Sequence, residues 1–318
     1  MDYKAAAALL GGWDNILILT HKRPDGDTLG CAVGLCALLR QCGKTAWVLN
    51  NPDATSRFTP YLEGYIAPEG FVYDKVVAVD VAALGLFGAE ARAIADSRGV
   101  DLCIDHHPSN EHYAKETCVE ADKAACGEII YKIVSELGHL DDQIAAMLYL
   151  AISTDTGCFV YNNTTPHTHA VAAVLMERDI HYKAINKRHF RTKSMVRLQI
   201  ESRLLEHMEV LEEGKVVLSA ITLADLAELH AREEDVEDIA AFLGQIEGVK
   251  VSATIRELEG GECKISLRTD PDYLNATQTC ALLGGGGHEA ASACAVTGTV
   301  RQAQEAMKQA ILQVLHGA

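Results

Sequence analysis

The sequence predicts an α/β protein with an N-terminal domain built on a parallel sheet and a smaller C-terminal α/β domain. At 318 residues the chain exceeds the length of about 250–300 residues at which a single hydrophobic core stops growing. Strand and helix patterns alternate up to about residue 182, which is typical of a parallel sheet, and new strand patterns begin near residue 214. We therefore expect domains at 1–185 and 214–318, joined by a connecting helix at 186–213.

The first predicted strand leads into a loop rich in metal-binding residue types. Residues 16–19 are four apolar residues, as in a buried strand, and Thr28 is expected to cap the helix that follows the loop. Within seven residues the loop places one imidazole and two carboxylates: His21, Asp25 and Asp27. These groups suit a divalent cation, although a turn with helix-capping aspartates explains them equally well when the loop is considered alone.

Three further polar groups follow other predicted elements. Asp80 ends the apolar run VVAVD, Asp105-His106-His107 ends LCIDHH, and Asp155 lies at the end of an apolar helical stretch. An isolated aspartate at such a position is usually a cap. Four such groups in one α/β unit are harder to explain as caps, because the carboxyl ends of parallel strands share one edge of the sheet. We therefore expect these side chains to converge.

The number of candidate ligands indicates two metal ions. Four carboxylates and two imidazoles exceed the three protein ligands that one catalytic ion usually has. Two ions about 3.5–4 Å apart, with one carboxylate between them, would use all six. The chemistry predicted is hydrolysis of a phosphoester by a metal-bound hydroxide. The candidate ligands are His21, Asp25, Asp27, Asp80, His106 and Asp155.

These motifs resemble those of the DHH phosphoesterases, a family named after the triplet found here at 105–107. HKRPDGDTLG resembles the first motif of the family, VAVD the second and AISTDTG the fourth. The resemblance implies that one Mn²⁺ is held by His21 and Asp25, and the other by Asp27, His106 and Asp155. It implies that Asp80 bridges the two ions.

The resemblance also implies a catalytic group around these ligands. Asp105 would orient the neighbouring ligands, and His107 would face the substrate phosphate. The catalytic residues implied are Asp80, Asp105, His106 and His107. The metal is expected to be Mn²⁺, with Mg²⁺ or Co²⁺ as alternatives.

The C-terminal part resembles the first type of DHH-associated domain. GGGGH at 284–288 resembles its substrate-binding loop, and KISLRT resembles its central strand. Glycines allow backbone N–H groups to approach an anion closely. The substrate-binding residues implied are His107, Arg268, Gly285, Gly286, Gly287 and His288. The active site is expected in the cleft between the domains. One departure is Ala291-Ser292-Ala293, since relatives often have a glycine shortly after the loop histidine.

The resemblance implies a phosphoesterase that degrades short oligoribonucleotides (nanoRNA, dinucleotides) to mononucleotides and converts 3′-phosphoadenosine 5′-phosphate (pAp) to AMP. A phosphodiesterase acting on cyclic dinucleotides such as c-di-AMP, or on linear dinucleotides, is the nearest alternative, because the motifs do not separate the two. A nucleotide sensor without catalytic activity is a third interpretation. It is disfavoured because all six ligand positions are filled.

Composition limits the partners and the compartment. A net charge of −16, from 44 acidic and 28 basic residues, argues against broad binding to long nucleic acid. The sequence has no uninterrupted apolar run of about 18 residues, so no membrane span is expected. The ten cysteines are scattered without a CxxC pair, which favours reduced thiols and a cytoplasmic location. A homodimer is left open.

Overall fold

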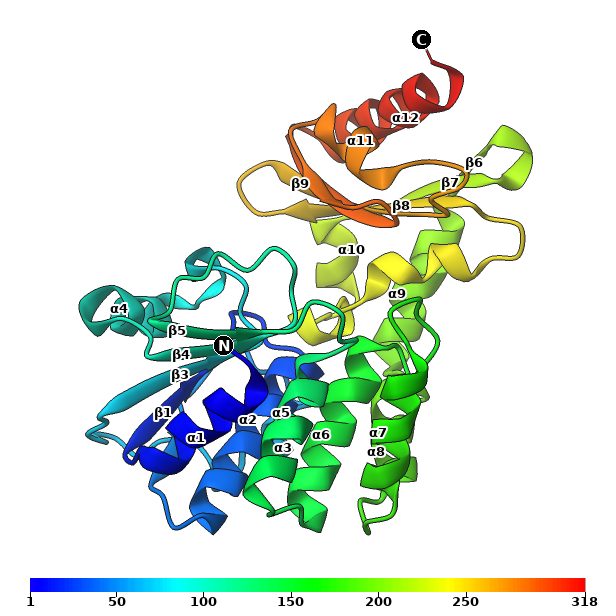
Figure 1. Cartoon of the computed structure of the whole chain (residues 1–318). Coiled ribbons are helices and arrows are strands. Elements are labelled where there is room, and N and C mark those ends of the chain that lie inside the picture. Colours follow the sequence, from blue (N-terminus) through cyan, green and yellow to red (C-terminus); the bar gives the residue numbers. More distant parts are fainter. Residues whose placement is uncertain (318) are drawn as a thin grey trace. The chain divides into compact units, whose positions relative to one another are not determined.

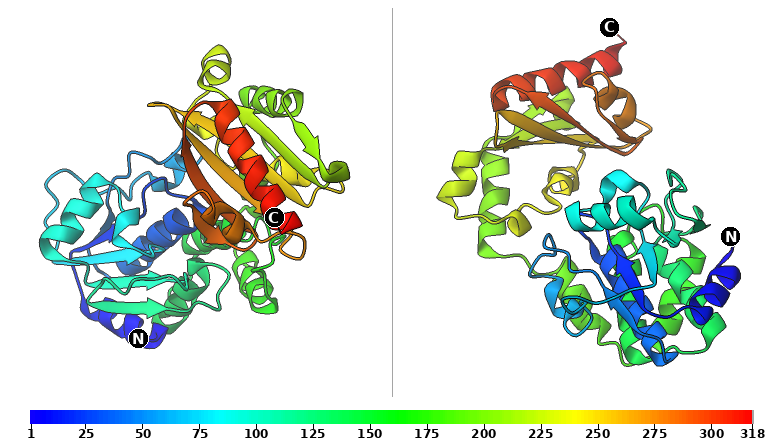
Figure 2. Two further views of the ribbon diagram at one scale, coloured as in Figure 1. Left: turned by 90° about the horizontal axis from the view of Figure 1, so that it is seen from above. Right: turned by 90° about the vertical axis from the view of Figure 1, so that its left-hand side faces the viewer.

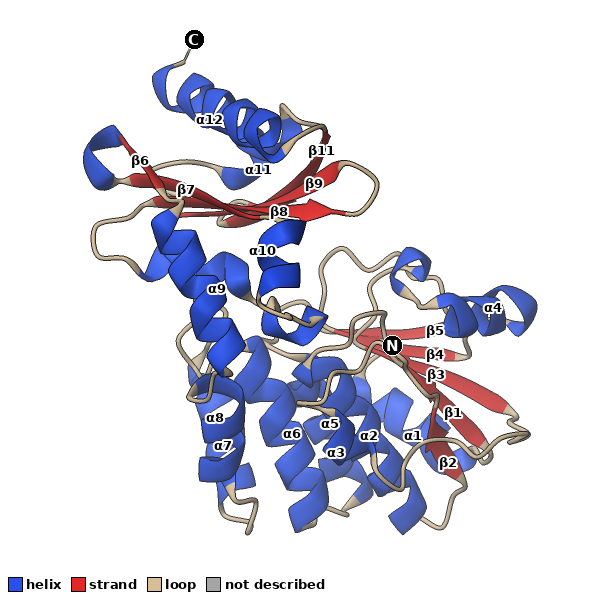
Figure 3. Cartoon of the chain, turned by 180° about the vertical axis from the view of Figure 1, so that it is seen from behind, coloured by secondary structure: helices blue, strands red, loops and turns tan. Residues whose placement is uncertain are grey.

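The first part of the chain is built on a parallel five-stranded sheet (Figure 1) with the strand order β2-β1-β3-β4-β5, in which β2 is labelled in Figure 3. In this computed structural model, which describes residues 1–317, the chain divides into two compact units: Met1–Thr192 and a second that begins at Lys193. The strands of the first sheet are β1 (Ile16–Leu19), β2 (Ala46–Val48), β3 (Lys75–Val79), β4 (Leu102–Asp105) and β5 (Glu116–Val119). The predicted parallel sheet is therefore confirmed.

Helices cover both faces of this sheet, which explains why its strands are continuously apolar. Ile16 and Ile18 of β1 face the larger core. Helices α1, α2, α5 and α6 cover this face of the sheet (Figure 3). Leu17 and Leu19 face a smaller core beneath α4. The helices of the unit are α1 (Tyr3–Gly12), α2 (Gly26–Gln41), α3 (Thr59–Leu62), α4 (Ala89–Arg98), α5 (Cys126–Leu137), α6 (Asp142–Asp155), α7 (Pro166–Met176) and α8 (Tyr182–Phe190), with a 3₁₀ turn at Leu84–Leu86.

Helices α2 and α6 approach each other along glycines of α2. A Cβ atom added to Gly26 would lie 2.3 Å from Thr154 Oγ1, and one added to Gly30 would lie 2.5 Å from the Met147 carbonyl oxygen. Any larger residue at either position would force the helices apart. The close approach brings the start of α2 beside the end of α6, where three of the predicted ligands lie.

The second unit contains a six-stranded mixed sheet with the order β10-β11-β9-β8-β7-β6. Helices α11 and α12 pack on one face (Figure 2), while α9 and short 3₁₀ turns pack on part of the other. Strands β8 and β9 form the hairpin predicted around Gly260 and Gly261. The strands are β6 (Glu209–Leu211), β7 (Val216–Ile221), β8 (Val251–Leu258), β9 (Glu262–Thr269), β10 (Gly286–His288) and β11 (Ala291–Thr297). The helices are α9 (Met195–Glu206), α10 (Leu223–Glu228), α11 (Ala276–Ala281) and α12 (Val300–His316), with 3₁₀ turns at Glu212–Gly214, Glu233–Asp235, Ile239–Ala241 and Leu243–Gln245.

The prediction of one connecting helix at 186–213 was wrong in detail. Helix α8 ends at Phe190, and α9 starts only at Met195. Ser194 caps α9 by accepting a hydrogen bond from the N–H of Arg197, so the chain restarts a helix there rather than continuing α8. Residues Glu209–Leu211 then form the edge strand β6 instead of the end of a helix.

Two predictions about the whole chain can be compared with the structure. All ten cysteines are unpaired thiols, in agreement with the expected reduced state. Among residues 1–317, none of the helices is both long enough and apolar enough to cross a bilayer.

Candidate metal centre

The predicted ligands come together at the carboxyl edge of the first sheet. His21 follows β1, Asp80 follows β3, and His106 follows β4. Asp155 is the last residue of α6, and Asp25 and Asp27 lie at the start of α2. Within each of three overlapping groups the ligand atoms lie within 4.8 Å of one another: His21, Asp25 and Asp80; Asp27, His106 and Asp155; and Asp80, His106 and His107.

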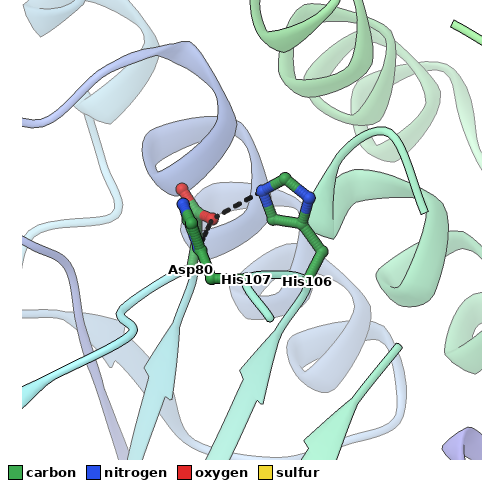
Figure 4. A group of neighbouring side chains, drawn as sticks. All are labelled: Asp80, His106 and His107. Carbon is green, nitrogen blue, oxygen red and sulfur yellow. Dashed lines mark ion pairs between the residues drawn. The ribbon is translucent and has the colours of Figure 1, made fainter. Parts of the chain in front are cut away.

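Asp80 lies at the centre of this cluster. Figure 4 shows the imidazoles of His106 and His107 next to its carboxylate: Oδ1 lies 3.5 Å from His106 Nε2 and 3.5 Å from His107 Nδ1. Oδ2 lies 3.8 Å from Nε2 of His21. The backbone at Asp80 is left-handed, with φ of +58°, directly after the extended strand β3. This sparsely populated conformation turns the chain abruptly at a functional position.

The imidazoles of His21 and His106 are held so that Nε2 faces the carboxylates. Nδ1 of His21 donates to the Lys22 carbonyl at 2.8 Å, and Nδ1 of His106 donates to the Lys123 carbonyl at 3.1 Å. A carbonyl can only accept, so Nδ1 carries a proton, and the tautomer that is neutral with its proton on Nδ1 presents the Nε2 lone pair. At His106 this lone pair faces Asp27, Asp80 and Asp155 at 3.8, 3.5 and 3.5 Å.

The aspartates of the first motif have different structural roles. Asp25 is the N-cap of α2, accepting from the N–H groups of Asp27 and Thr28 at 3.0 and 3.1 Å, so the prediction that Thr28 caps this helix was wrong. The Thr28 hydroxyl instead donates to the carbonyl of Val79. Asp25 therefore acts as a cap, as the alternative interpretation proposed, and its Oδ1 also lies 3.6 Å from Nε2 of His21.

Asp27 is fixed by a distant part of the chain. It is 1% exposed and accepts from the backbone N–H groups of Cys126 and Gly127, at 2.7 and 3.0 Å, at the start of α5. A helix N-terminus favours a negative charge. This anchor was missed from the sequence, because the contact joins residues about a hundred positions apart and a Cys-Gly pair carries no signal of it.

Asp105 is occupied with hydrogen bonds and holds its neighbours in place. Its carboxylate is fully buried and accepts from the backbone N–H of His106 at 2.9 Å, from His107 Nδ1 at 2.7 Å and from Asn110 Nδ2 at 2.6 Å. Burial is the largest single effect and opposes ionisation, but the hydrogen bonds and charge of His107 together with the bond from Asn110 outweigh it, so the pKa of Asp105 is lowered. The hydrogen bond between Asp105 and His107 raises the pKa of His107. Asn110 was missed from the sequence.

The carboxylates of the cluster carry more negative charge than the histidines beside them can balance. Burial and the charge of Asp25 raise the pKa of Asp27 to about 7, and burial and the charge of Asp27 raise that of Asp155 to about 7. Burial and the neighbouring carboxylates also raise the pKa of Asp80 well above its usual range. Carboxylates gathered this closely need a cation among them to stay ionised at neutral pH.

Two buried atoms at the centre of the cluster fit metal ligation. Within residues 1–317, Asp80 Oδ1 and His106 Nε2 are both buried without a hydrogen-bond partner. Both are acceptors that face each other at 3.5 Å, which is unfavourable unless a cation lies between or beside them. The residues present therefore fit the divalent ions that the sequence predicts.

The predicted substrate-binding residues of the second unit lie on two neighbouring parts of its sheet. Arg268 belongs to β9, and Gly286, Gly287 and His288 form the short strand β10. A Cβ on Gly285 would lie 2.2 Å from the Ala293 carbonyl oxygen, and Gly287 has φ of +147°. Part of the glycine run is therefore required to pair β10 with β11, a role that the sequence did not indicate.

The fold and the site define an α/β protein with a cluster of metal ligands at the carboxyl edge of its parallel sheet. Residues 15–152 match the N-terminal domain of the DHH family, and residues 213–317 match the DHHA1 domain. The chain belongs to the DHH family.

Individual relatives cover almost the whole chain. One, from Thermus thermophilus, is named "bifunctional oligoribonuclease and PAP phosphatase NrnA"; it is 31% identical over 94% of this chain and 90% of its own. Among solved structures, an exopolyphosphatase-related protein from Bacteroides fragilis has a TM-score of 0.86 at 23% identity, over 98% and 96% of the two chains. RecJ from Thermus thermophilus, solved in complex with Mn²⁺, has a TM-score of 0.56 at 13% identity, over 99% of this chain and 55% of its own.

Proposed function

We propose that this protein is a metal-dependent phosphoesterase that hydrolyses short oligoribonucleotides to mononucleotides and removes the 3′-phosphate of pAp to leave AMP. The observation that carries the proposal is the complete ligand cluster around Asp80, in a chain that is 31% identical to a relative named for these activities. A protein that only binds nucleotides has no need of six converging ligands.

The three side-chain groups indicate which residues would hold two cations. His21 and Asp25 would bind one, Asp27, His106 and Asp155 the other, and Asp80 would contact both. When bound, two divalent cations supply a water of lowered pKa and neutralise charge on the phosphate. We propose Mn²⁺, with Mg²⁺ or Co²⁺ as alternatives, because mixed imidazole and carboxylate ligands suit such ions.

The protein's own groups have distinct tasks around the scissile phosphate. His107 keeps its Nδ1 proton in the hydrogen bond to Asp105. Its raised pKa favours the doubly protonated ring, whose Nε2–H can donate to a phosphate oxygen. Its side chain is 38% exposed, so a substrate can reach it. Asp105 has no exposed surface and acts by fixing that ring.

The second unit supplies residues for the rest of the substrate. We propose that Arg268, His288 and the glycines Gly285, Gly286 and Gly287 bind the nucleotide attached to the scissile phosphate. Arg268 has no carboxylate partner among the described residues, so its charge remains available. The net charge of −16 supports a preference for short substrates, since long polyanions would be repelled by the remaining surface.

A product-resolved assay tests the proposal. The protein loaded with Mn²⁺ would be offered dinucleotides to pentanucleotides, pAp, c-di-AMP and its linear product in parallel. We expect mononucleotides from the linear RNAs and AMP from pAp, and we expect Asp80→Ala to lose at least about 1,000-fold in kcat. Turnover confined to cyclic dinucleotides would transfer the assignment to that class. No turnover of any phosphoester, with intact nucleotide binding, would favour a sensor.

The proposal includes a cytoplasmic location, and it leaves a monomer and a homodimer to be distinguished by measurement. Ten unpaired cysteines and a nucleotide substrate support a cytoplasmic location. Light scattering of the purified protein would distinguish a monomer from a homodimer.

A further inference from the structure

Two candidate ligands of one cation are held by the same short segment, residues 123–127. The first backbone N–H groups of α5 bind Asp27, and the carbonyl of Lys123, in the loop before α5, accepts from Nδ1 of His106. These contacts fix the position of each side chain. For His106 they also decide which ring nitrogen faces the carboxylates.

The third ligand of this group, Asp155, is tied to the same segment. The side-chain amide of Asn163 donates to the backbone carbonyls of Asp155 and Ala124, each at 3.0 Å. A shift of residues 123–127 would therefore disturb all three ligands together. Whatever holds the start of α5 in place acts on this half of the metal centre.

Glu128 follows the segment directly and is an unusual residue to bury. It has no exposed surface, lies in the first turn of α5, and accepts from the Thr168 hydroxyl through Oε1 at 2.7 Å. Its second oxygen, Oε2, is buried without a hydrogen-bond partner in the described part of the chain, residues 1–317. Nε2 of His167 lies 3.7 Å from Oε2, beyond hydrogen-bonding distance. A buried carboxylate with one hydrogen bond costs stability, so its presence needs an explanation.

The bond from Thr168 joins the starts of two helices. Thr165 caps α7, and its backbone N–H donates to the Thr168 hydroxyl oxygen at 3.1 Å. A hydroxyl has one proton, and that of Thr168 is given to Glu128. The 3.0 Å contact between the two threonine hydroxyls is therefore donated by Thr165. The capping box of α7 thus directs a single proton at the carboxylate on α5.

Glu128 does not itself belong to the metal centre. Among residues 1–317 it is a member of none of the three groups whose ligand atoms lie together. Its carboxylate faces the start of α7. Contacts of this kind, which hold ligands from behind, commonly change metal affinity by about 10- to 100-fold when they are removed.

We propose that Glu128 is a positioning residue of the metal centre. Its hydrogen bond with Thr168 holds the start of α5 on α7, and this keeps residues 123–127 where the three ligands need them. The inference deepens the proposed function, on which the presence of the cation rests. Glu128 contacts neither the cation nor the substrate.

Two variants remove the bond from opposite sides. Thr168→Val keeps the shape of the side chain and deletes the donated proton. Glu128→Met deletes the acceptor and leaves no buried charge unpaired, so it should fold even where Thr168→Val does not. Thr168→Ser is the conservative variant that retains the hydroxyl.

Ala172→Gly is the matched control. Ala172 is buried on α7, one turn after Thr168, and lies outside the capping box. Glycine weakens the helix there without removing a hydrogen bond to Glu128. Isothermal titration calorimetry would measure Mn²⁺ binding without substrate, and thermal unfolding in a chelator would measure stability.

Wild type should bind two Mn²⁺ ions. We expect Thr168→Val and Glu128→Met to weaken the binding of one of them by about 10- to 100-fold, whereas Thr168→Ser should bind both nearly as wild type does. Hydrolysis by Thr168→Val should fall at low Mn²⁺ and recover at high Mn²⁺, because no ligand is missing. Ala172→Gly should unfold at a lower temperature than wild type and keep both affinities.

Wild-type Mn²⁺ affinity in both Thr168→Val and Glu128→Met would overturn the positioning role. An equal loss of affinity in Ala172→Gly would overturn it as well, because any weakening of α7 would then have the same effect. Failure of the proposed function looks different. In that case the wild type hydrolyses no phosphoester, yet its Mn²⁺ affinity still depends on the bond between Glu128 and Thr168, and the positioning role stands.

Discussion

Asp155→Asn should stabilise the metal-free protein and at the same time weaken its response to metal, because it removes one ligand of the cation expected at Asp27, His106 and Asp155. Burial and the charge of Asp27 raise the pKa of Asp155 to about 7 from its usual 3.8. Between these two values the folded state binds more protons than the unfolded chain, so stability falls as pH rises through this window. The loss of unfolding free energy caused by the ionised Asp155 is complete at pH 8 and absent below about pH 3.8. Asparagine removes it, because it carries no charge.

The size of the effect follows from the same two pKa values. A difference of about three pH units corresponds to about 4 kcal/mol of unfolding free energy at pH 8. The Asp155 side chain is 29% exposed, and solvent reduces the penalty, so we expect about 2 kcal/mol. That gain should raise the melting temperature of the metal-free protein by roughly 5 °C at pH 8, and by less at pH 5.

Thermal unfolding in a chelator, followed by titration with Mn²⁺, measures both effects. Wild type should gain stability with Mn²⁺, whereas Asp155→Asn should gain clearly less, since His21, Asp25 and Asp80 remain, and it should lose phosphoesterase activity. Asp142→Asn is the matched control, since Asp142 is an exposed residue at the opposite end of α6. It should slightly destabilise the helix start and keep the full response to Mn²⁺. An Asp155→Asn protein that is less stable than wild type without metal, or that gains as much stability from Mn²⁺ as wild type does, would refute the reasoning.

Three further predictions concern the second unit, the partly buried His189 and helix packing. Arg268→Ala and His288→Ala should each raise KM for dinucleotides by about 10-fold or more at nearly constant kcat, as measured in the product-resolved assay; a fall in kcat alone would contradict their role in binding. Burial and two nearby arginines lower the pKa of His189 to about 4 from 6.5, so wild type should lose up to about 3 kcal/mol as pH falls from 6.5 to 4. His189→Phe should not show this loss when urea unfolding is compared at pH 7 and 4.5. Gly30→Val should lower the free energy of unfolding by about 2 kcal/mol or more, because its Cβ would collide with a backbone carbonyl of α6. Gly12→Ala is the control, since a Cβ added there meets no other atom, and in thermal unfolding it should lower the free energy of unfolding by less than half as much.

The sequence predicted the central strands of both sheets, because burial produces a recognisable apolar pattern, but it did not predict β5, β6, β10 and β11 at or near the sheet edges. Residues 16–19 are covered on both faces, so the strand reads as an uninterrupted apolar run. Gly260 and Gly261 separate two alternating runs, which is typical of a hairpin. The positions of Asp80 and His106 could also be predicted from the sequence, since residues that follow parallel strands lie at one edge of the sheet.

Other features depend on contacts that a linear pattern cannot reveal. The anchoring of Asp27 requires the start of α5, about a hundred residues away, to fold against α2. The left-handed backbone at Asp80 is imposed by its surroundings, because aspartate only tolerates this conformation. The break between α8 and α9 lies in a polar stretch that continues a helical spacing of apolar residues, so only the cap at Ser194 marks it.

Gly26 stands between two candidate ligands, Asp25 and Asp27, and its missing side chain leaves the place that Thr154 occupies next to Asp155. Ligand atoms must stay within about 0.2 Å of their preferred distances for an ion to be held well. A single methyl group at this contact would widen the gap between two helices by more than that. The spacing of the candidate ligands therefore depends in part on a residue that has no ligand atom of its own.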